Sequence, residues 1–268
     1  NLLKEVKMQK FNMDDSSSNK YGGMTHFVNL PSGGGFYPEG HPLYGLDKVE
    51  VKMMTTKEED ILTNQSYIEN GVVLDKLFES ILMVDVHPKD MLDADKMAVM
   101  IAARVEAYGP EYTVTLTCNK CQNFYLWNVD LSSFEPADAS PDFEKTPGGT
   151  FVVELPKSQS IVEFQHLLPN QIESITKTVD KMKSLNINTN FNTEFYKRVI
   201  LSVNGDDKTE SISAFVENMK ILDSRKFLKA YQSTVPSMNT NVKSTCPECG
   251  HQNEGGMPVQ ANFFFPEF

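Results

Sequence analysis

Hydrophobic and polar residues alternate along several short stretches of the chain, a pattern typical of half-buried β-strands. Val49, Val51 and Met53 alternate with charged residues and predict one strand. The stretches 112–117 and 123–131 alternate in the same way, with a Cys-x-x-Cys sequence between them, and predict a hairpin. A further strand pair is expected at 151–155 and 161–167, and a strand is expected to lead into Cys246.

Other stretches place apolar residues three and four positions apart, which is the spacing of an amphipathic helix. In the first half of the chain this spacing predicts helices around 73–82 and 97–105. Thr55 or Thr56, with Glu58 or Glu59 three residues later, predicts a capping box at the start of an earlier helix. Four more helices are expected at 169–183, 192–203, 210–220 and 223–234.

These elements divide the 268 residues into four segments and predict an α+β fold. Residues 1–29 form a polar N-terminal arm, either a free tail or a strap that lies on a partner. Residues 30–131 form a β/α part that ends in the first Cys-x-x-Cys. Residues 132–240 form a mostly helical insert, and residues 241–268 carry the second Cys-x-x-Cys and an aromatic tail.

The charge of the chain limits its partners. It has 25 basic and 36 acidic residues, a net charge of −11, and no segment basic enough to neutralise a phosphate backbone. Its longest apolar run, 97–103, ends at Arg104, whereas a membrane span needs about 20 residues. The first residues also lack the apolar stretch of a signal peptide. We therefore expect no nucleic acid and no membrane as partners.

The four cysteines carry the strongest chemical signal in the sequence. Cys118 with Cys121, and Cys246 with Cys249, form two Cys-x-x-Cys knuckles, a spacing that lets both thiolates bind one metal ion. The long interval between the pairs is tolerable because the entropy cost of loop closure grows only logarithmically with length. We expect one structural Zn²⁺ in a zinc-ribbon-like β element, with a redox pair or two disulfides as alternatives. Four cysteine ligands leave no open position for catalysis.

Other candidate sites are weaker. His251 follows the second knuckle closely enough to assist as a ligand, and no nucleophile or nucleotide-binding motif is present. We therefore expect no enzymatic activity and no small-molecule substrate. The glycines Gly33, Gly34 and Gly35 allow close backbone approach and are candidate interaction residues. The aromatic residues Phe263, Phe264 and Phe265 either fill the chain's own core or dock on a neighbouring protein.

The order of several motifs resembles a known family. LPSGGGFYPEG is followed by MTTKEEDIL, AYGPEY, the first knuckle, CPECG and FFFP, over residues 30–266. This order resembles the baseplate hub subunit family of T-even-like contractile-tailed bacteriophages, although the first knuckle, CNKC, lacks the proline often found after its first cysteine. The resemblance implies a non-enzymatic structural or assembly component that works with other baseplate and hub proteins. It also implies a location in the virion tail baseplate, and in the host cytoplasm during assembly.

An alternative function is that of a cytosolic zinc-ribbon regulatory protein associated with nucleic acid. Such a protein needs a basic face around its knuckles. The neighbouring charges are Lys120 and Lys243 against Glu248 and Glu254, which cancel. The sequence therefore favours the baseplate function over the regulatory one.

Overall fold

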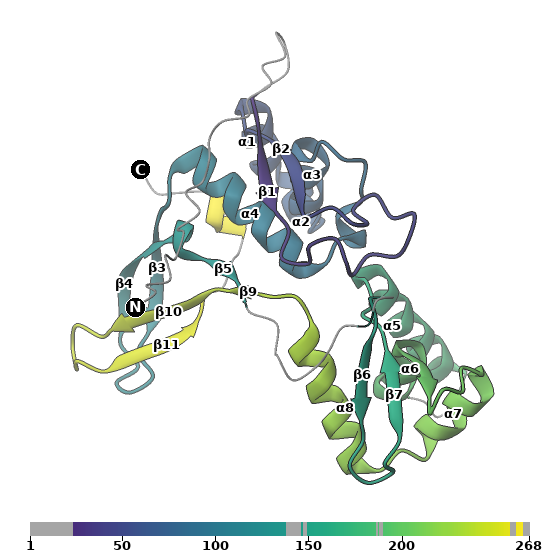
Figure 1. Cartoon of the computed structure of the whole chain (residues 1–268). Helices are drawn as coiled ribbons and strands as arrows, with labels where there is room; N and C mark the ends of the chain where they lie inside the picture. Colours follow the sequence, from purple (N-terminus) through teal and green to yellow (C-terminus); the bar gives the residue numbers. More distant parts are fainter. Residues whose placement is uncertain are drawn as a thin grey trace, which may run out of the picture.

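The computed structural model describes residues 24–137, 146, 149–185, 187, 190–257 and 261–264. These residues form two lobes, each built around its own hydrophobic core (Figure 1). The first lobe contains residues 24–137 and 238–264, and the insert lobe contains residues 149–235. The architecture mixes helices and sheets, so the α+β prediction is confirmed. None of the helices in the described ranges is long and apolar enough to cross a membrane.

The first lobe holds four antiparallel strand pairs and four α-helices among its described residues. The strand pairs are β1 (Thr25–Asn29) with β2 (Lys48–Lys52), β3 (Glu111–Thr117) with β4 (Phe124–Asp130), β5 (Glu135–Pro136) with β9 (Met238–Asn239), and β10 (Asn241–Thr245) with β11 (Gln252–Gly256). The helices are α1 (Thr56–Leu62), α2 (Gln65–Glu69), α3 (Val73–Ile81) and α4 (Asp93–Tyr108), with short 3-10 turns at η1 (Pro88–Asp90), η2 (Leu131–Ser133) and η3 (Ala261–Phe264).

Local sequence signals explain the start of this lobe. The capping box predicted at α1 is confirmed, because the N–H of Thr55 donates to Glu58 Oε2 at 2.8 Å. Strand β2 appears where alternation predicted it, and β1 covers the last five residues of the segment predicted as an arm. Residues 1–23 lie outside the described residues.

A buried carboxylate fixes the glycine loop of the first lobe. Asp95 on α4 accepts the N–H of Ser32 at 2.9 Å and the hydroxyls of Ser32 and Tyr37, both at 2.6 Å. Within the loop, Gly34 has φ +68°, and a Cβ there would lie 2.3 Å from the backbone nitrogen of Leu46. The close approach that Gly34 permits is therefore to the chain's own backbone.

The end of the chain packs into the first lobe. Phe263 and Phe264 in η3 have no exposed surface, and the ring of Phe263 meets that of Tyr112 edge to face at 5.0 Å. The buried Arg104 donates from Nε to the carbonyl oxygen of Phe263 at 3.0 Å. Of the two alternatives for these aromatics, the structure has Phe263 and Phe264 in the chain's own core. Phe265 lies outside the described residues.

The insert lobe contains a three-stranded antiparallel sheet and four helices in the part of it that the structure describes. The sheet order is β6 (Phe151–Glu154), β7 (Ile161–Phe164) and β8 (Ile200–Val203). The helices are α5 (Pro169–Ser184), α6 (Phe191–Val199), α7 (Thr209–Glu217) and α8 (Ile221–Thr234). The prediction of one helix over 192–203 was wrong at its end, because pairing with β7 draws residues 200–203 into the sheet.

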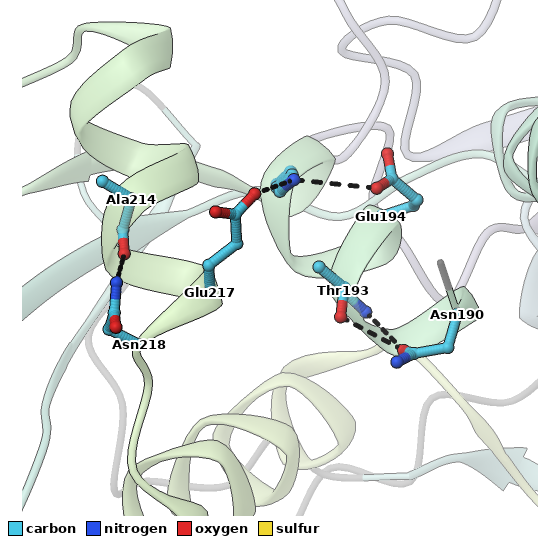
Figure 2. Close-up of polar contacts among 7 residues, drawn as sticks. Asn190, Thr193, Glu194, Ala214, Glu217 and Asn218 are labelled. Atoms are coloured by element: carbon cyan, nitrogen blue, oxygen red, sulfur yellow. Dashed lines mark hydrogen bonds and ion pairs between the residues drawn. The ribbon is translucent and has the colours of Figure 1, made fainter. Parts of the chain in front are cut away.

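Polar contacts also tie the helices of the insert lobe together. The ammonium nitrogen of Lys197 on α6 lies 2.8 Å from Glu217 Oε1 on α7 and 3.7 Å from Glu194 Oε1 (Figure 2). Asn190 caps α6 by accepting the N–H of Thr193 at 3.1 Å. Of these contacts, the ion pair of Lys197 with Glu217 links α6 to α7, and because it is partly solvent-exposed it contributes little to the stability of the lobe.

The two lobes touch through a few side chains. Phe36, from the glycine loop of the first lobe, stacks on Phe151 at a centroid distance of 5.8 Å and lies 5.3 Å from the His166 ring. Asn170 at the start of α5 donates to Asp90 at 2.5 Å. The contact between the lobes thus includes an aromatic cluster and a polar bond beside it.

Candidate metal centre

The four cysteines come together from the turns of two hairpins. Cys118 and Cys121 lie in the turn of the β3–β4 hairpin, and Cys246 and Cys249 lie in the turn of the β10–β11 hairpin. All four Sγ atoms lie within 4.8 Å of one another. The predicted meeting of the two knuckles is therefore confirmed, and it brings together segments separated by the whole insert lobe (Figure 1).

The spacing of the sulfurs matches a tetrahedral metal site. Cys118 Sγ lies 3.6 Å from Cys249 Sγ, and Cys121 Sγ lies 3.7 Å from Cys246 Sγ. A tetrahedron with zinc–sulfur bonds of about 2.3 Å has edges of about 3.8 Å. A disulfide would need about 2.05 Å, and all four cysteines are free. The donor set and its geometry thus suit a thiolate-binding cation.

The two knuckles share one backbone design. The N–H of Cys118 donates to the carbonyl of Asn123 at 2.9 Å, and the N–H of Cys246 donates to the carbonyl of His251 at 2.9 Å. Each of these bonds closes the base of a hairpin turn five residues after its first cysteine. The repeated bond holds each cysteine pair in the same orientation towards the cluster.

A second repeated bond requires an unusual backbone angle. The N–H of Gln122 donates to the carbonyl of Cys118 at 2.9 Å, and that of Gly250 donates to the carbonyl of Cys246 at 3.0 Å. Both donors have positive φ, +60° for Gln122 and +65° for Gly250. Glycine adopts this angle without strain, whereas glutamine does not. A glycine directly after the second cysteine, as at Gly250, is a recognisable signal for this conformation, whereas nothing in the sequence indicates it at Gln122.

A buried polar network joins the two hairpins beside the cysteines. The amide of Asn253 on β11 accepts the N–H of Asn119 at 2.9 Å and donates to the Tyr125 hydroxyl at 3.0 Å. The same amide nitrogen lies 3.8 Å from Cys118 Sγ. The Tyr125 hydroxyl also bonds to the hydroxyl of Ser244 on β10 at 2.8 Å. Sequence reasoning missed this network because its members are scattered polar residues without a motif.

Hydrogen bonds and the closeness of the other thiols shift the pKa values of Cys118 and Cys121 in opposite directions. The backbone N–H groups of Cys121 and Lys120 lower the pKa of Cys118 to about 6. Although the N–H of Asn123 lowers the pKa of Cys121, desolvation and the three neighbouring thiols raise it to about 12. Four thiolates this close repel one another strongly unless a cation lies between them. A divalent metal ion would allow all four to ionise.

Among the described residues, the cluster offers four sulfur ligands and no nitrogen or oxygen ligand. His251 does not belong to it, although its backbone carbonyl helps to close the second knuckle. Four protein ligands fill a tetrahedral shell and leave no position for a substrate or a reactive water. Sites with four protein ligands of this kind are typical of structural metal centres.

The other predicted interaction residues lie apart from the cysteines. The loop residues Gly33, Gly34 and Gly35 lie in the glycine loop beside Asp95, and Phe263 and Phe264 belong to the main core of the first lobe. The cysteines form a separate small cluster with Tyr125. Because Phe263 and Phe264 are buried, they offer no exposed anchor, and docking through the glycines or Phe265 stays a prediction.

Comparison with protein families identifies the chain. Residues 24–265 match the family model described as T4 bacteriophage base plate protein. A search of curated proteins found no match, and neither did a search of solved structures. The match covers both lobes and all four cysteines. The chain therefore belongs to the T4 bacteriophage base plate protein family and has a structural role in the phage baseplate.

Proposed function

We propose that this chain is a non-enzymatic hub component of the contractile-tail baseplate, or an assembly factor of that hub, stabilised by one structural Zn²⁺. Membership of the baseplate family supports the general role. The observation that carries the finer proposal is the meeting of four cysteine sulfurs from two distant hairpins. The partners are other baseplate and hub proteins, in the virion and, during assembly, in the host cytoplasm.

The metal acts as a clasp in this proposal. The chain leaves the first lobe after β5 (Glu135–Pro136) and returns to it at β9 (Met238–Asn239), so the hairpins β3–β4 and β10–β11 flank the insert lobe in sequence. Isolated two-stranded hairpins are marginally stable in water. Zinc bound by both turns adds folding free energy and fixes one hairpin against the other. It thereby keeps the two ends of the insert close together.

The regulatory alternative gains little support from the surroundings of the cluster. Lys243 lies 3.7 Å from Glu254 across the β10–β11 hairpin, so its charge is largely compensated. Lys120 and Glu248 occupy equivalent positions in the two knuckles, directly before the second cysteine, and carry opposite charges. A phosphate backbone would find no continuous basic surface there.

Elemental analysis of the purified chain tests the metal. We expect one zinc per chain in the native protein and almost none in a Cys246→Ser variant. His251→Ala is the matched control, since it changes a neighbouring side chain outside the sulfur cluster and should keep the metal. A native protein without zinc, prepared without chelators, would contradict the structural-zinc proposal.

Complementation of a phage that lacks this protein tests the hub role. We expect electron microscopy to find no complete baseplates without the protein and normal baseplates when the native chain is supplied. Cross-linking in infected cells should then join the chain to hub proteins. Normal baseplates in its absence would refute the hub proposal and leave the zinc result unaffected.

A further inference from the structure

Helix α8 (Ile221–Thr234) has apolar residues on two opposite faces. Phe227, Ala230 and Tyr231 are buried in the core of the insert lobe. On the other side, Ile221 is 75% exposed, Leu222 50% and Leu228 37%. A surface helix usually carries polar residues on its outer side. The outer side of α8 is therefore suited to contact another surface.

Basic residues lie among these exposed apolar side chains. Arg225 and Lys229 follow Ile221 at helical spacing, so they lie on the same outer face, and both are exposed. The one acidic residue of the helix, Asp223, turns inward and is 1% exposed. Its carboxylate accepts the N–H groups of Lys157 at 2.7 Å and Ser158 at 3.0 Å. Nothing acidic on α8 itself offsets the positive charge of this face.

We define the α8 outer face as Ile221, Leu222, Arg225, Leu228 and Lys229. Because this face combines basic and apolar side chains, it is complementary to a partner surface that is acidic and partly apolar. Oppositely charged surfaces steer association and fix its specificity, while the exposed apolar side chains add burial.

The first lobe of the same chain has the complementary charge. Residues 24–137 and 238–264 carry 9 Lys+Arg against 19 Asp+Glu, a net charge of −10. The insert lobe, residues 149–235, carries 11 against 10, a net charge of +1. The acidity of the chain is thus concentrated in one lobe, and a cationic helix face lies on the other.

We propose that the α8 outer face docks on the acidic first lobe of a second copy of this chain. The contact joins two different surfaces, so it is heterologous, and each copy keeps one surface of each kind for a further neighbour. Such head-to-tail contacts build closed rings or open chains. The proposal rests only on the charges of this chain and on the exposed side chains of α8. It is therefore independent of the proposed hub role.

Sedimentation velocity of the full, metal-loaded chain tests the association. We expect reversible self-association at about 0.05 M salt that weakens strongly at about 0.5 M, where charges are screened within a few ångströms. The double variant Arg225→Glu with Lys229→Glu should raise the apparent Kd at least about tenfold, a change of about 1.4 kcal/mol. Leu222→Ser should weaken association with little change in its salt dependence.

A matched control separates this face from the effect of net charge. Lys177→Glu with Lys181→Glu reverses two exposed lysines on α5 of the same lobe and changes the net charge by the same amount. We expect this control to associate almost as strongly as the native chain. Equal weakening by both double variants would overturn the proposal, because it would show general repulsion between acidic chains.

Cross-linking identifies the docked surface. Copies labelled with ¹⁵N are mixed with unlabelled copies and treated with a reagent that joins lysine to carboxylate. We expect cross-links between copies from Lys229 to acidic residues of the first lobe. Cross-links only within the insert lobes, or a chain that stays monomeric at low salt and about 100 μM, a concentration above the dissociation constants of many weak contacts, would overturn the proposal.

Discussion

The two hairpins that hold the cysteine cluster share one backbone design and differ in almost everything else. In β3–β4 the positive φ after the second cysteine falls on Gln122, and in β10–β11 it falls on Gly250. The outer side of β4 exposes Phe124 and Leu126 at 71% and 70%. The outer side of β10–β11 instead carries an ion pair between charged side chains. The backbone hydrogen bonds and the positive φ that the hairpins share are those that a metal site requires. The outer side chains, in which they differ, reflect the surroundings of each hairpin.

The two lobes differ in how they are held together. The insert lobe has a sheet covered by helices and a core of aromatic and β-branched residues. In the first lobe the two hairpins contribute Val114, Val129 and Val242 to the main core, but their cysteine-bearing ends have only a small cluster of cysteines and Tyr125. A lobe with a large core keeps its fold without a metal, whereas the cysteine-bearing ends of the hairpins, with their small cluster, depend on one.

Loss of the metal should have the largest effect, and the lobes should respond unequally. In Cys118→Ser the remaining thiols cannot close the coordination shell, and we expect the free energy of unfolding of the hairpins to fall by more than about 4 kcal/mol. Hydrogen exchange measured by mass spectrometry should show fast exchange in β3–β4 and β10–β11 and unchanged protection in α5–α8. Equal loss of protection in both lobes would mean that the metal stabilises the whole chain.

Removal of the Asn253 amide should have the next largest effect. Asn253→Ala leaves the N–H of Asn119 and the Tyr125 hydroxyl without one buried partner each. We expect the free energy of unfolding to fall by about 1–3 kcal/mol, with zinc still bound. Chemical denaturation and metal analysis of the same samples measure both quantities.

The neighbouring variant Gln252→Ala serves as the control for that experiment. Its side chain is exposed on the same strand, β11, so its removal should be nearly neutral. If Asn253→Ala is also nearly neutral, water replaces the amide, and the network contributes less than its geometry indicates.

Substitutions at the residue directly after each second cysteine, Gln122 and Gly250, should change the stability of the two hairpins in opposite directions. Gln122→Gly removes the strain of a side chain at φ +60° and should stabilise the β3–β4 hairpin by about 1 kcal/mol. Gly250→Ala introduces the same strain at φ +65° and should destabilise β10–β11 by a similar amount, because nothing lies within 4 Å of the added Cβ. Thermal unfolding of the two zinc-loaded variants measures both shifts. Shifts of the same sign would show that the turns are not equivalent in solution.

Sequence alone could predict the parts of this structure that depend on local signals. The Thr55–Glu58 capping box acts within four residues, and the cysteine spacing specifies a knuckle within four residues, so both were predictable. Strand β8 was not, because residues 200–203 continue a helical pattern until β7 pairs with them.

The remaining features depend on contacts that are distant in sequence. The three phenylalanines at the chain end were consistent with a core or an interface, and only the fold brings Phe263 to Arg104. In the sequence, Asn253 does not differ from other polar residues of a hairpin, and only the fold shows its hydrogen bonds to Asn119 and Tyr125. A sequence pattern identifies the metal ligands but does not identify the polar groups that support them.

The smallest effects should come from the outer faces on which the hairpins differ most. Phe124 on β4 lies opposite the exposed Thr117 of β3, and its ring is mostly in water already, so Phe124→Thr should change the free energy of unfolding by less than about 0.5 kcal/mol. Lys243→Ala should cost equally little, since exposed ion pairs contribute about 0–1 kcal/mol. Chemical denaturation at low and high salt measures both changes, and only the lysine variant should respond to salt. A loss above about 1 kcal/mol for Phe124→Thr would contradict its exposure, because a ring in water contributes almost nothing to folding. It would mean that in solution the ring is buried against another surface.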